Sequence, residues 1–157
     1  MNFEAQIKSL INNAPQDGVT PSIVAAIAPV LLAIARSLRY PQYYLLQSID
    51  RNWVMTTLSN RTNRQIEKKV IYAFPNFKDA SSDAIQNVDS QVTAIAVPVI
   101  HILFQLMALE PVDSIVFFET AGTSTNAVEI KRSELQSLVQ QKLQENKNID
   151  SVPPDIA

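Results

Sequence analysis

The apolar run VTAIAVPVIHILFQLMAL, residues Val92–Leu109, decides the fold of this chain. It is just long enough to cross a bilayer, but Pro98, His101 and Gln105 interrupt it, and it lacks the flanking residues of a membrane span. Its first part, Val92–Val97, is rich in β-branched residues, which favour a strand. Because Pro98 suits the first position of a helix, we expect a buried strand that leads into a buried helix.

A second apolar stretch, Ile23–Leu38, predicts another buried helix. Thr20 suits the N-cap and Pro21 the first helical position, whereas Pro29 should kink or divide the helix. The stretch has almost no polar face before Arg36, so the helix is expected to be core or to be shared with a partner. The candidate partner-contacting residues are its apolar stripe and a tryptophan on a predicted sheet edge: Ile23, Ile27, Val30, Leu31, Ile34 and Trp53.

Shorter periodic segments occupy the rest of the chain. Apolar residues at helical spacing predict a first helix at Phe3–Ile11 and a last helix at Ser133–Leu143. A further short helix is expected at Lys78–Gln86. Alternating or β-branched residues predict a hairpin over Tyr43–Leu58, a strand at Val70–Phe74 and a second hairpin over Ser114–Lys131.

These elements predict an α+β fold, with a mainly antiparallel sheet of about five or six strands and the helices packed on one face. A chain of 157 residues has room for one domain. We expect it to span residues 1–145, with a helical part at 1–39 and the sheet and other helices at 40–145. The polar residues after Glu145, together with Pro153 and Pro154, predict a mobile C-terminal tail at 146–157.

The order of these elements follows a known pattern. A polar-tipped hairpin precedes VIYAFPNFKDA (Val70–Ala80), and a strand then leads through Pro98 into a helix, the turn Glu110–Asp113, and a strand and hairpin before the last helix. Over roughly residues 43–143 this order resembles the N-terminal domain of the SseB family named for enhanced serine sensitivity. The chain departs from the family pattern at Glu119 and Thr120, where an Asn-Pro turn is usual. The resemblance implies helices on one side of an α+β sheet and an accessory or interaction module, and it transfers no catalytic residue.

Composition excludes several kinds of reactive site. The sequence has no cysteine, one histidine and two glycines, which removes thiolate chemistry, sulfur-ligated zinc and glycine-rich phosphate loops. His101 remains a candidate proton carrier for an enzyme, with Glu110 or Asp113 as its partner, although a histidine in an apolar stretch more often bonds to backbone in the core. The carboxylates of Asp113 and Glu119 are expected to be solvated. We therefore expect no catalytic residue, no metal site and no cofactor.

A basic cluster in a polar loop supplies an alternative function. Such a cluster suits contact with phosphates, with Trp53 or Tyr72 as a stacking surface for bases. The same charges also suit a loop that blunts pairing at a sheet edge. A net charge of −2 disfavours a nucleic-acid partner. The residues concerned are Arg61, Arg64, Lys68 and Lys69.

Contact with other proteins is the function that the sequence favours. The leading hypothesis is a non-enzymatic protein that binds a partner protein or a second copy of itself, through Ile23–Leu38 or the edge near Trp53. Residues Met1–Leu10 include Glu4 and Lys8 and hold no continuous hydrophobic run, so a secretory signal is not expected. We expect a cytoplasmic protein without a membrane span.

Overall fold

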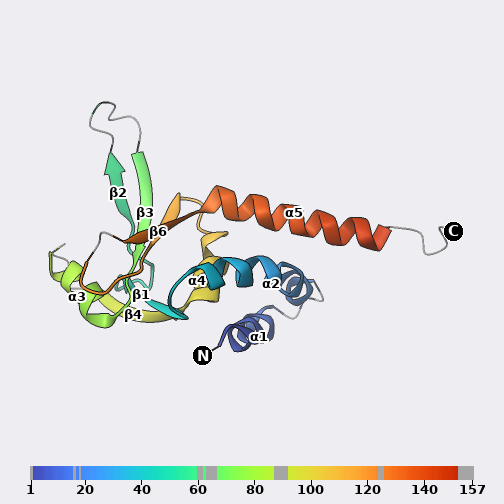
Figure 1. Ribbon diagram of the computed structural model, residues 1–157, viewed down its shortest axis with the longest axis horizontal. Coiled ribbons are helices and arrows are strands. Elements are labelled where there is room, and N and C mark those ends of the chain that lie inside the picture. The colour runs from blue at the N-terminus through green and yellow to red at the C-terminus, as the bar shows by residue number, and fades with distance from the viewer. Residues whose placement is uncertain are drawn as a thin grey trace.

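The computed structural model describes residues 2–15, 17, 19–59, 62, 67–86, 92–123 and 126–151, and it leaves out the side chains of residues 83–86 and 146–151. Figure 1 shows the arrangement of the described elements. The helices are α1 (Phe3–Asn13), α2 (Thr20–Ser37), α3 (Phe77–Gln86), α4 (Val99–Leu106) and α5 (Arg132–Ser151). The strands are β1 (Gln42–Gln47), β2 (Thr56–Ser59), β3 (Glu67–Ala73), β4 (Thr93–Pro98), β5 (Ser114–Phe118) and β6 (Ala127–Lys131).

The α+β class is confirmed, but the expected single antiparallel sheet is wrong. The described strands form a two-stranded sheet, β1-β4, and a four-stranded sheet in the order β2-β3-β5-β6. Within the larger sheet, β3 and β5 run parallel. The chain between them crosses over through α3, β4 and α4, because a tight turn joins only antiparallel strands. Two backbone hydrogen bonds between Tyr44 and Phe74, 2.8 and 2.9 Å long, join the two sheets.

The first predicted hairpin is present at its turn and then opens. Arg51 adopts a φ of 66° in this turn, and a bridge pairs Gln47 with Trp53. Beyond this bridge the chain leaves β1, and Thr56 pairs with Val70 of β3. The second strand of the hairpin therefore belongs to the other sheet, since pairing with β3 replaces most of the local pairing with β1.

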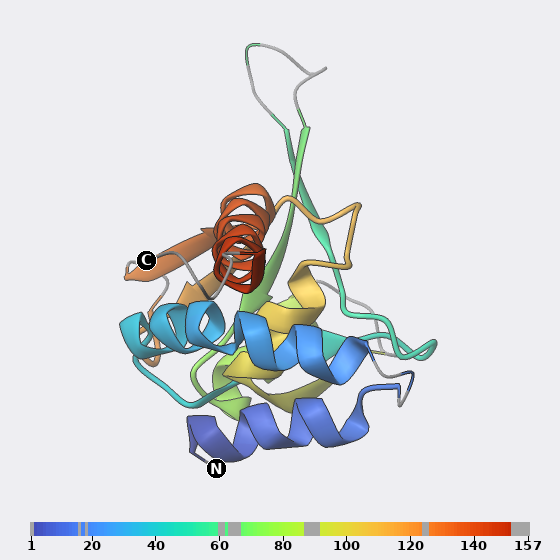
Figure 2. The same cartoon turned by 90° about the vertical axis from the view of Figure 1, so that its right-hand side faces the viewer.

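One helix, α3, lies on the opposite face of the β1-β4 sheet from the main core. Along β1, Tyr43 and Leu45 enter that core, whereas Leu46 belongs to a smaller cluster with Phe74 and Ala80 of α3. Figure 2 shows α1, α2 and α5 together on the side of the molecule that faces the viewer. The expectation that the helices pack on one face is wrong for α3, because a strand with apolar residues on both faces needs a cover on each.

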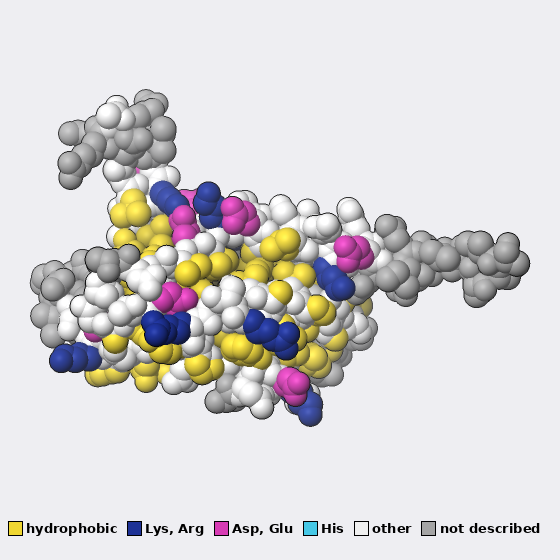
Figure 3. Space-filling view, in the orientation of Figure 1, with side chains coloured by type: hydrophobic (Ala, Val, Ile, Leu, Met, Phe, Trp, Pro, Cys, Tyr) yellow, Lys and Arg dark blue, Asp and Glu magenta, His cyan; other side chains and the backbone are white. Residues whose placement is uncertain are grey.

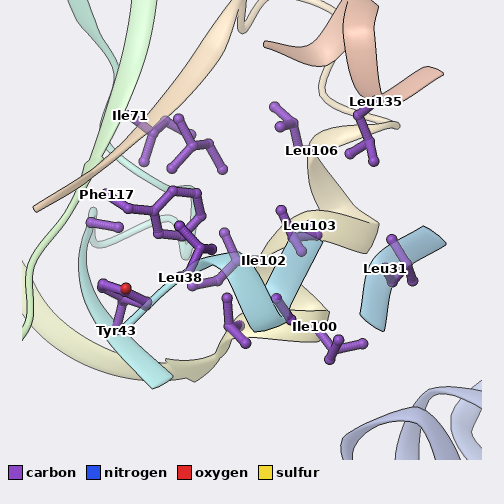
Figure 4. Packing of buried hydrophobic residues seen from close by; sticks show 14 of the residues in the cluster. Leu31, Leu38, Tyr43, Ile71, Ile100, Ile102, Leu103, Leu106, Phe117 and Leu135 are labelled. Carbon is purple, nitrogen blue, oxygen red and sulfur yellow. The ribbon is translucent and has the colours of Figure 1, made fainter. Parts of the chain in front are cut away.

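The central element of the main core is α4. Five of its 8 residues are buried, and the split of the apolar run at Pro98 into strand and helix is confirmed. Figure 4 shows Leu31 of α2 and Leu135 of α5 on one side of α4, and Tyr43 and Phe117 on the other. The rings of Tyr43 and Phe117 meet edge to face with centroids 4.9 Å apart. Each such side chain stabilises the fold by ~1.5–3 kcal/mol through its burial.

The helix α2 is continuous across Pro29, so this residue does not divide it. Its start is capped by Asp17 and not, as expected, by Thr20. The Asp17 carboxylate accepts hydrogen bonds from the backbone N–H groups of Val19 and Thr20, at 2.9 and 2.7 Å, and from the Thr20 hydroxyl at 2.7 Å. The bonds from Thr20, followed by that from Val19, lower the pKa of Asp17 to about 2.

The last helix is longer than predicted. α5 continues to Ser151, so residues 146–151 are helical, and residues 152–157 lie outside the described residues. A mobile tail at 146–157 stays a prediction. Leu135 and Val139 anchor its first half in the main core. Figure 1 shows its second half extending beyond the other elements. A helix that is already formed gains one backbone hydrogen bond for each residue that it adds, so it extends at a lower cost than a new helix needs to begin.

Candidate functional site

Some of the predicted partner-contacting residues of α2 lie in the core, and others lie at the surface. Ile27 and Leu31 are 1% and 0% exposed and belong to the main core. They are therefore corrected from contact residues to core residues, because α2 packs against α1, α4 and α5 together. Val30 and Ile34 are half-buried against the same core. Ile23, near the start of α2, is 42% exposed and remains available to a partner.

Trp53 lies in the connection between β1 and β2. Its side chain is half-buried and packs against the main core. Met55, two residues further along, is 42% exposed. This predicted edge is thus partly accessible, and it presents apolar side chains.

A shallow apolar depression lies at the C-terminal end of α4. Its volume is about 440 Å³, and Phe104, Gln105, Met107, Ala108 and Leu109 line it. Phe104, Met107 and Leu109 are partly buried against the main core, whereas Gln105 and Ala108 are exposed. The sequence does not predict this depression, because the unbroken apolar run at Val92–Leu109 indicates burial along its whole length.

Three segments that carry other exposed apolar residues lie on the right in Figure 2, and Figure 1 shows them spread along the long axis of the molecule. In Figure 2 the start of α2, the β1–β2 connection and the chain leaving α4 are all on the right. Val19 comes directly before α2 and is 57% exposed, and Ile23 near the start of α2 is 42% exposed. Large exposed apolar groups that gather on one side are typical of contact surfaces. We use the term lateral apolar surface for Val19, Ile23, Trp53, Met55, Phe104, Met107, Ala108 and Leu109.

The predicted basic cluster is described only in part, since Arg61 and Arg64 lie outside the described residues. Lys68 forms an ion pair with Glu129 across the sheet, and the Ser114 hydroxyl donates to the same carboxylate at 2.6 Å. Lys68, followed by Ser114, lowers the pKa of Glu129. The positive charge of Lys68 is therefore matched by a neighbouring negative charge.

Charges of both signs surround a second depression, near the start of α5. Its volume is about 340 Å³, and its lining residues are Glu67, Lys68, Asp113, Lys131, Arg132 and Ser133. The backbone N–H of Lys69 donates to Asp113 at 2.8 Å. Figure 3 likewise shows basic and acidic side chains interspersed on the visible face. The described part of the basic cluster does not form a surface of one sign, and binding of nucleic acid stays a prediction.

His101 lies in the first turn of α4, far along the helix from its expected partners. Glu110 and Asp113 follow the other end of α4, so the structure does not bring the three together. The Nε2 atom of His101 is buried without a hydrogen-bond partner among the described residues. Burial lowers the pKa of this histidine, and a hydrogen bond with the main chain of Gln6 acts in the opposite direction.

A buried carboxylate, Glu119, ties the end of β5 to the chain between α2 and β1. It is 6% exposed, so the expectation that it is solvated is wrong. It accepts a hydrogen bond of 2.5 Å from the Tyr43 hydroxyl and one of 3.1 Å from the backbone N–H of Arg39. Burial, followed by the bond to Glu119, raises the pKa of Tyr43. Its partners are distant in sequence, so no local pattern identifies this site.

Possible metal ligands and long apolar helices also bear on the kind of site. Among the described residues, no group of three or more histidine, aspartate or glutamate side chains is placed to hold a metal ion. In the same part of the chain, α2 is the one helix whose length and apolar composition match a membrane span, a property that the core helix of a folded domain shares. No protein-family model matches the chain, and a comparison with curated proteins found no match.

Proposed function

We propose that this chain is a non-enzymatic module that works by contact with another protein chain, through the lateral apolar surface. The depression of about 440 Å³ at the end of α4 is the observation that supports this proposal. It is large enough to take an apolar side chain, and four of its five lining residues, all except Gln105, are apolar. A partner that inserts a leucine or an aromatic side chain there would bury apolar area from both chains.

The composition of the surface agrees with this role. None of the five residues that line the depression at the end of α4 is charged, and the cores of protein–protein interfaces are depleted of charge. Ile23 and Trp53, two of the residues proposed from the sequence, belong to it. The accessory or interaction role implied by the SseB resemblance agrees with the proposal and stays a prediction.

Site-specific photo-crosslinking tests the proposal in cells that make the protein. A photoreactive amino acid at Ala108, an exposed residue of the depression, is expected to give a discrete adduct. The same group at Gln140, which is exposed on α5, serves as the matched control and is expected to give none. The mass of the adduct distinguishes a second copy of this chain from a different protein.

A blocking variant completes the experiment. Ala108→Arg fills the depression from an exposed position, so the fold is expected to be kept while the adduct from a photoreactive group at Met55 is lost. Circular dichroism and urea unfolding check that the variant is folded. Adducts of equal yield at Ala108 and Gln140, or no adduct at either position, would contradict the proposal.

A further inference from the structure

The helix α1 is held on the body of the protein by a small set of contacts around Gln6. Phe3, Ile7 and Leu10 pack against the main core. The Gln6 side chain is fully buried, where its Nε2 donates to the carbonyl oxygen of Pro41 and its Oε1 accepts from the backbone N–H of Ile100, each at 2.9 Å. This second bond satisfies a free N–H group in the first turn of α4. The docking of α1 thus depends on the first turn of α4.

His101 occupies the position next to this contact. Its Nε2 is buried and lacks a partner among the described residues. Its ring also makes a hydrogen bond with the main chain of Gln6 in α1. A neutral imidazole tolerates such a site with one unpaired acceptor. An imidazolium carries a second N–H donor and a full charge, and burying both without a partner is unfavourable.

The charged groups around His101 do not offset this cost. The elements packed most closely against α4 are α1, α2 and β4, and buried residues of β1, β5 and α5 share its core. The charged residues of α1 and α2 in the described chain are Glu4, Lys8 and Arg36, all three exposed, and β1, β4 and β5 carry none. The charged residues of α5 whose side chains are described are Arg132 and Lys142, both half-buried, and Glu134 and Glu145, both exposed. The ring also lies in the first turn of a helix, where the backbone dipole disfavours a positive charge.

We propose that α1 is a pH-sensitive latch, in which proton uptake by His101 releases α1 from α4 and uncovers the apolar surface beneath Phe3, Ile7 and Leu10. At neutral pH the ring is neutral and α1 stays docked. His101 binds a proton more tightly in the open form than in the docked form. At acid pH the equilibrium between the two forms therefore moves toward the open form. This latch goes beyond the proposed function, because it requires no partner and involves the other end of α4.

The direction of the pH effect follows from the partial burial of the ring, since His101 is half-buried as a residue and its Nε2 is covered. Burial lowers the pKa of His101 in the docked state below the ordinary value of 6.5. The docked state therefore loses no stability above that value and loses it progressively as the pH falls below it. One proton changes the opening equilibrium by at most about tenfold per pH unit.

Hydrogen exchange of the full chain, read by mass spectrometry, tests the latch. After correction for intrinsic rates, exchange in α1 is expected to rise by about threefold or more between about pH 7.5 and pH 5.5. Exchange in β5 is expected to stay unchanged. His101→Gln should abolish this rise in α1 exchange. If the His101→Gln variant does not fold, His101→Leu serves in its place and should give the same result. Glu4→Gln, which removes an exposed carboxylate of α1, is the matched control and should keep the rise.

A titration of the His101 ring provides a direct test, because the sequence has one histidine. Its ring signal in a proton NMR spectrum should shift over the same pH range in which α1 opens. The latch is refuted if α1 exchange in the wild type does not respond to pH, or if His101→Gln shows the same rise. It is equally refuted if β5 opens together with α1, since that result indicates global unfolding.

Discussion

The contact between Tyr43 and Glu119 gives the sharpest prediction of stability. Tyr43→Phe removes one hydroxyl from a fully buried ring and leaves the packing against Phe117 in place. The Glu119 carboxylate, 6% exposed, then loses a hydrogen bond of 2.5 Å and keeps the longer ones from the Arg39 N–H, at 3.1 and 3.3 Å. A hydrogen bond to a charged group contributes about 1.5–3 kcal/mol. We therefore expect the free energy of unfolding to fall by about 2–3 kcal/mol.

Urea unfolding at neutral pH measures this change, with Tyr40→Phe as the matched control. Tyr40 meets the Tyr43 ring edge to face at 5.7 Å, and its hydroxyl has no described partner. Its removal should change the free energy by about 0.5 kcal/mol or less. If the two variants are equally stable, the buried bond to Glu119 does not contribute as inferred.

Alkaline pH provides a second readout of the same contact. Burial and the bond to Glu119 raise the pKa of Tyr43 above its ordinary value of 10.0. The folded protein therefore keeps the phenol proton when the unfolded chain releases it, so stability is lost as the pH rises above that value. Tyr43→Phe should lack this component of the alkaline loss, and an identical alkaline profile in both proteins would count against the assignment.

Three further changes test other parts of the structure. Asp17→Ala should fray the start of α2, which hydrogen exchange measures, and an unchanged exchange rate in the variant would contradict the cap. In the wild type, capping should weaken as the pH falls from 3.8 toward about 2, because the pKa of Asp17 is lowered. Glu129→Gln should lower the free energy of unfolding in urea by about 0.5–1 kcal/mol, since the ion pair with Lys68 is partly exposed. The wild type should lose this contribution as the pH falls through the lowered pKa of Glu129, and the variant should lack that acid-dependent loss. Equal acid sensitivity of the two proteins would argue against the pair. Ile27→Ala should cost about 2–4 kcal/mol and Ile23→Ala about 1 kcal/mol or less, because Ile27 is 1% and Ile23 42% exposed; equal costs would contradict the placement of α2.

Local patterns predicted most of the helices and strands. The β-branched residues before Pro98 and the apolar residues after it correctly separate β4 from α4. The stripe predicted on α2 was slightly misplaced, since Val24, Ala28 and Ala35 are buried with Ile27, whereas Ile23 is not. Small alanine side chains let neighbouring helices approach closely, and hydrophobicity alone does not reveal this.

Long-range features were beyond the reach of local patterns. Strand pairing depends on contacts between distant segments. The pairing of β2 with β3, and not with β1 as the hairpin pattern predicts, therefore leaves no local signal in the sequence. Glu119 reaches Tyr43 and Arg39 across 76 and 80 residues. The depression at the end of α4 arises where a predicted core helix reaches the surface, and its accessibility depends on where the neighbouring elements end.

The central claim is that residues from α2 and from the end of α4 act as one contact surface. A photoreactive group at Ile23, tested alone and in combination with Ala108→Arg, examines this claim most directly. Ala33→Arg, which adds the same charge at an exposed position later in α2, is the control. We predict that Ala108→Arg removes the Ile23 adduct and that Ala33→Arg preserves it; an Ile23 adduct that survives Ala108→Arg in the folded protein would contradict a shared surface.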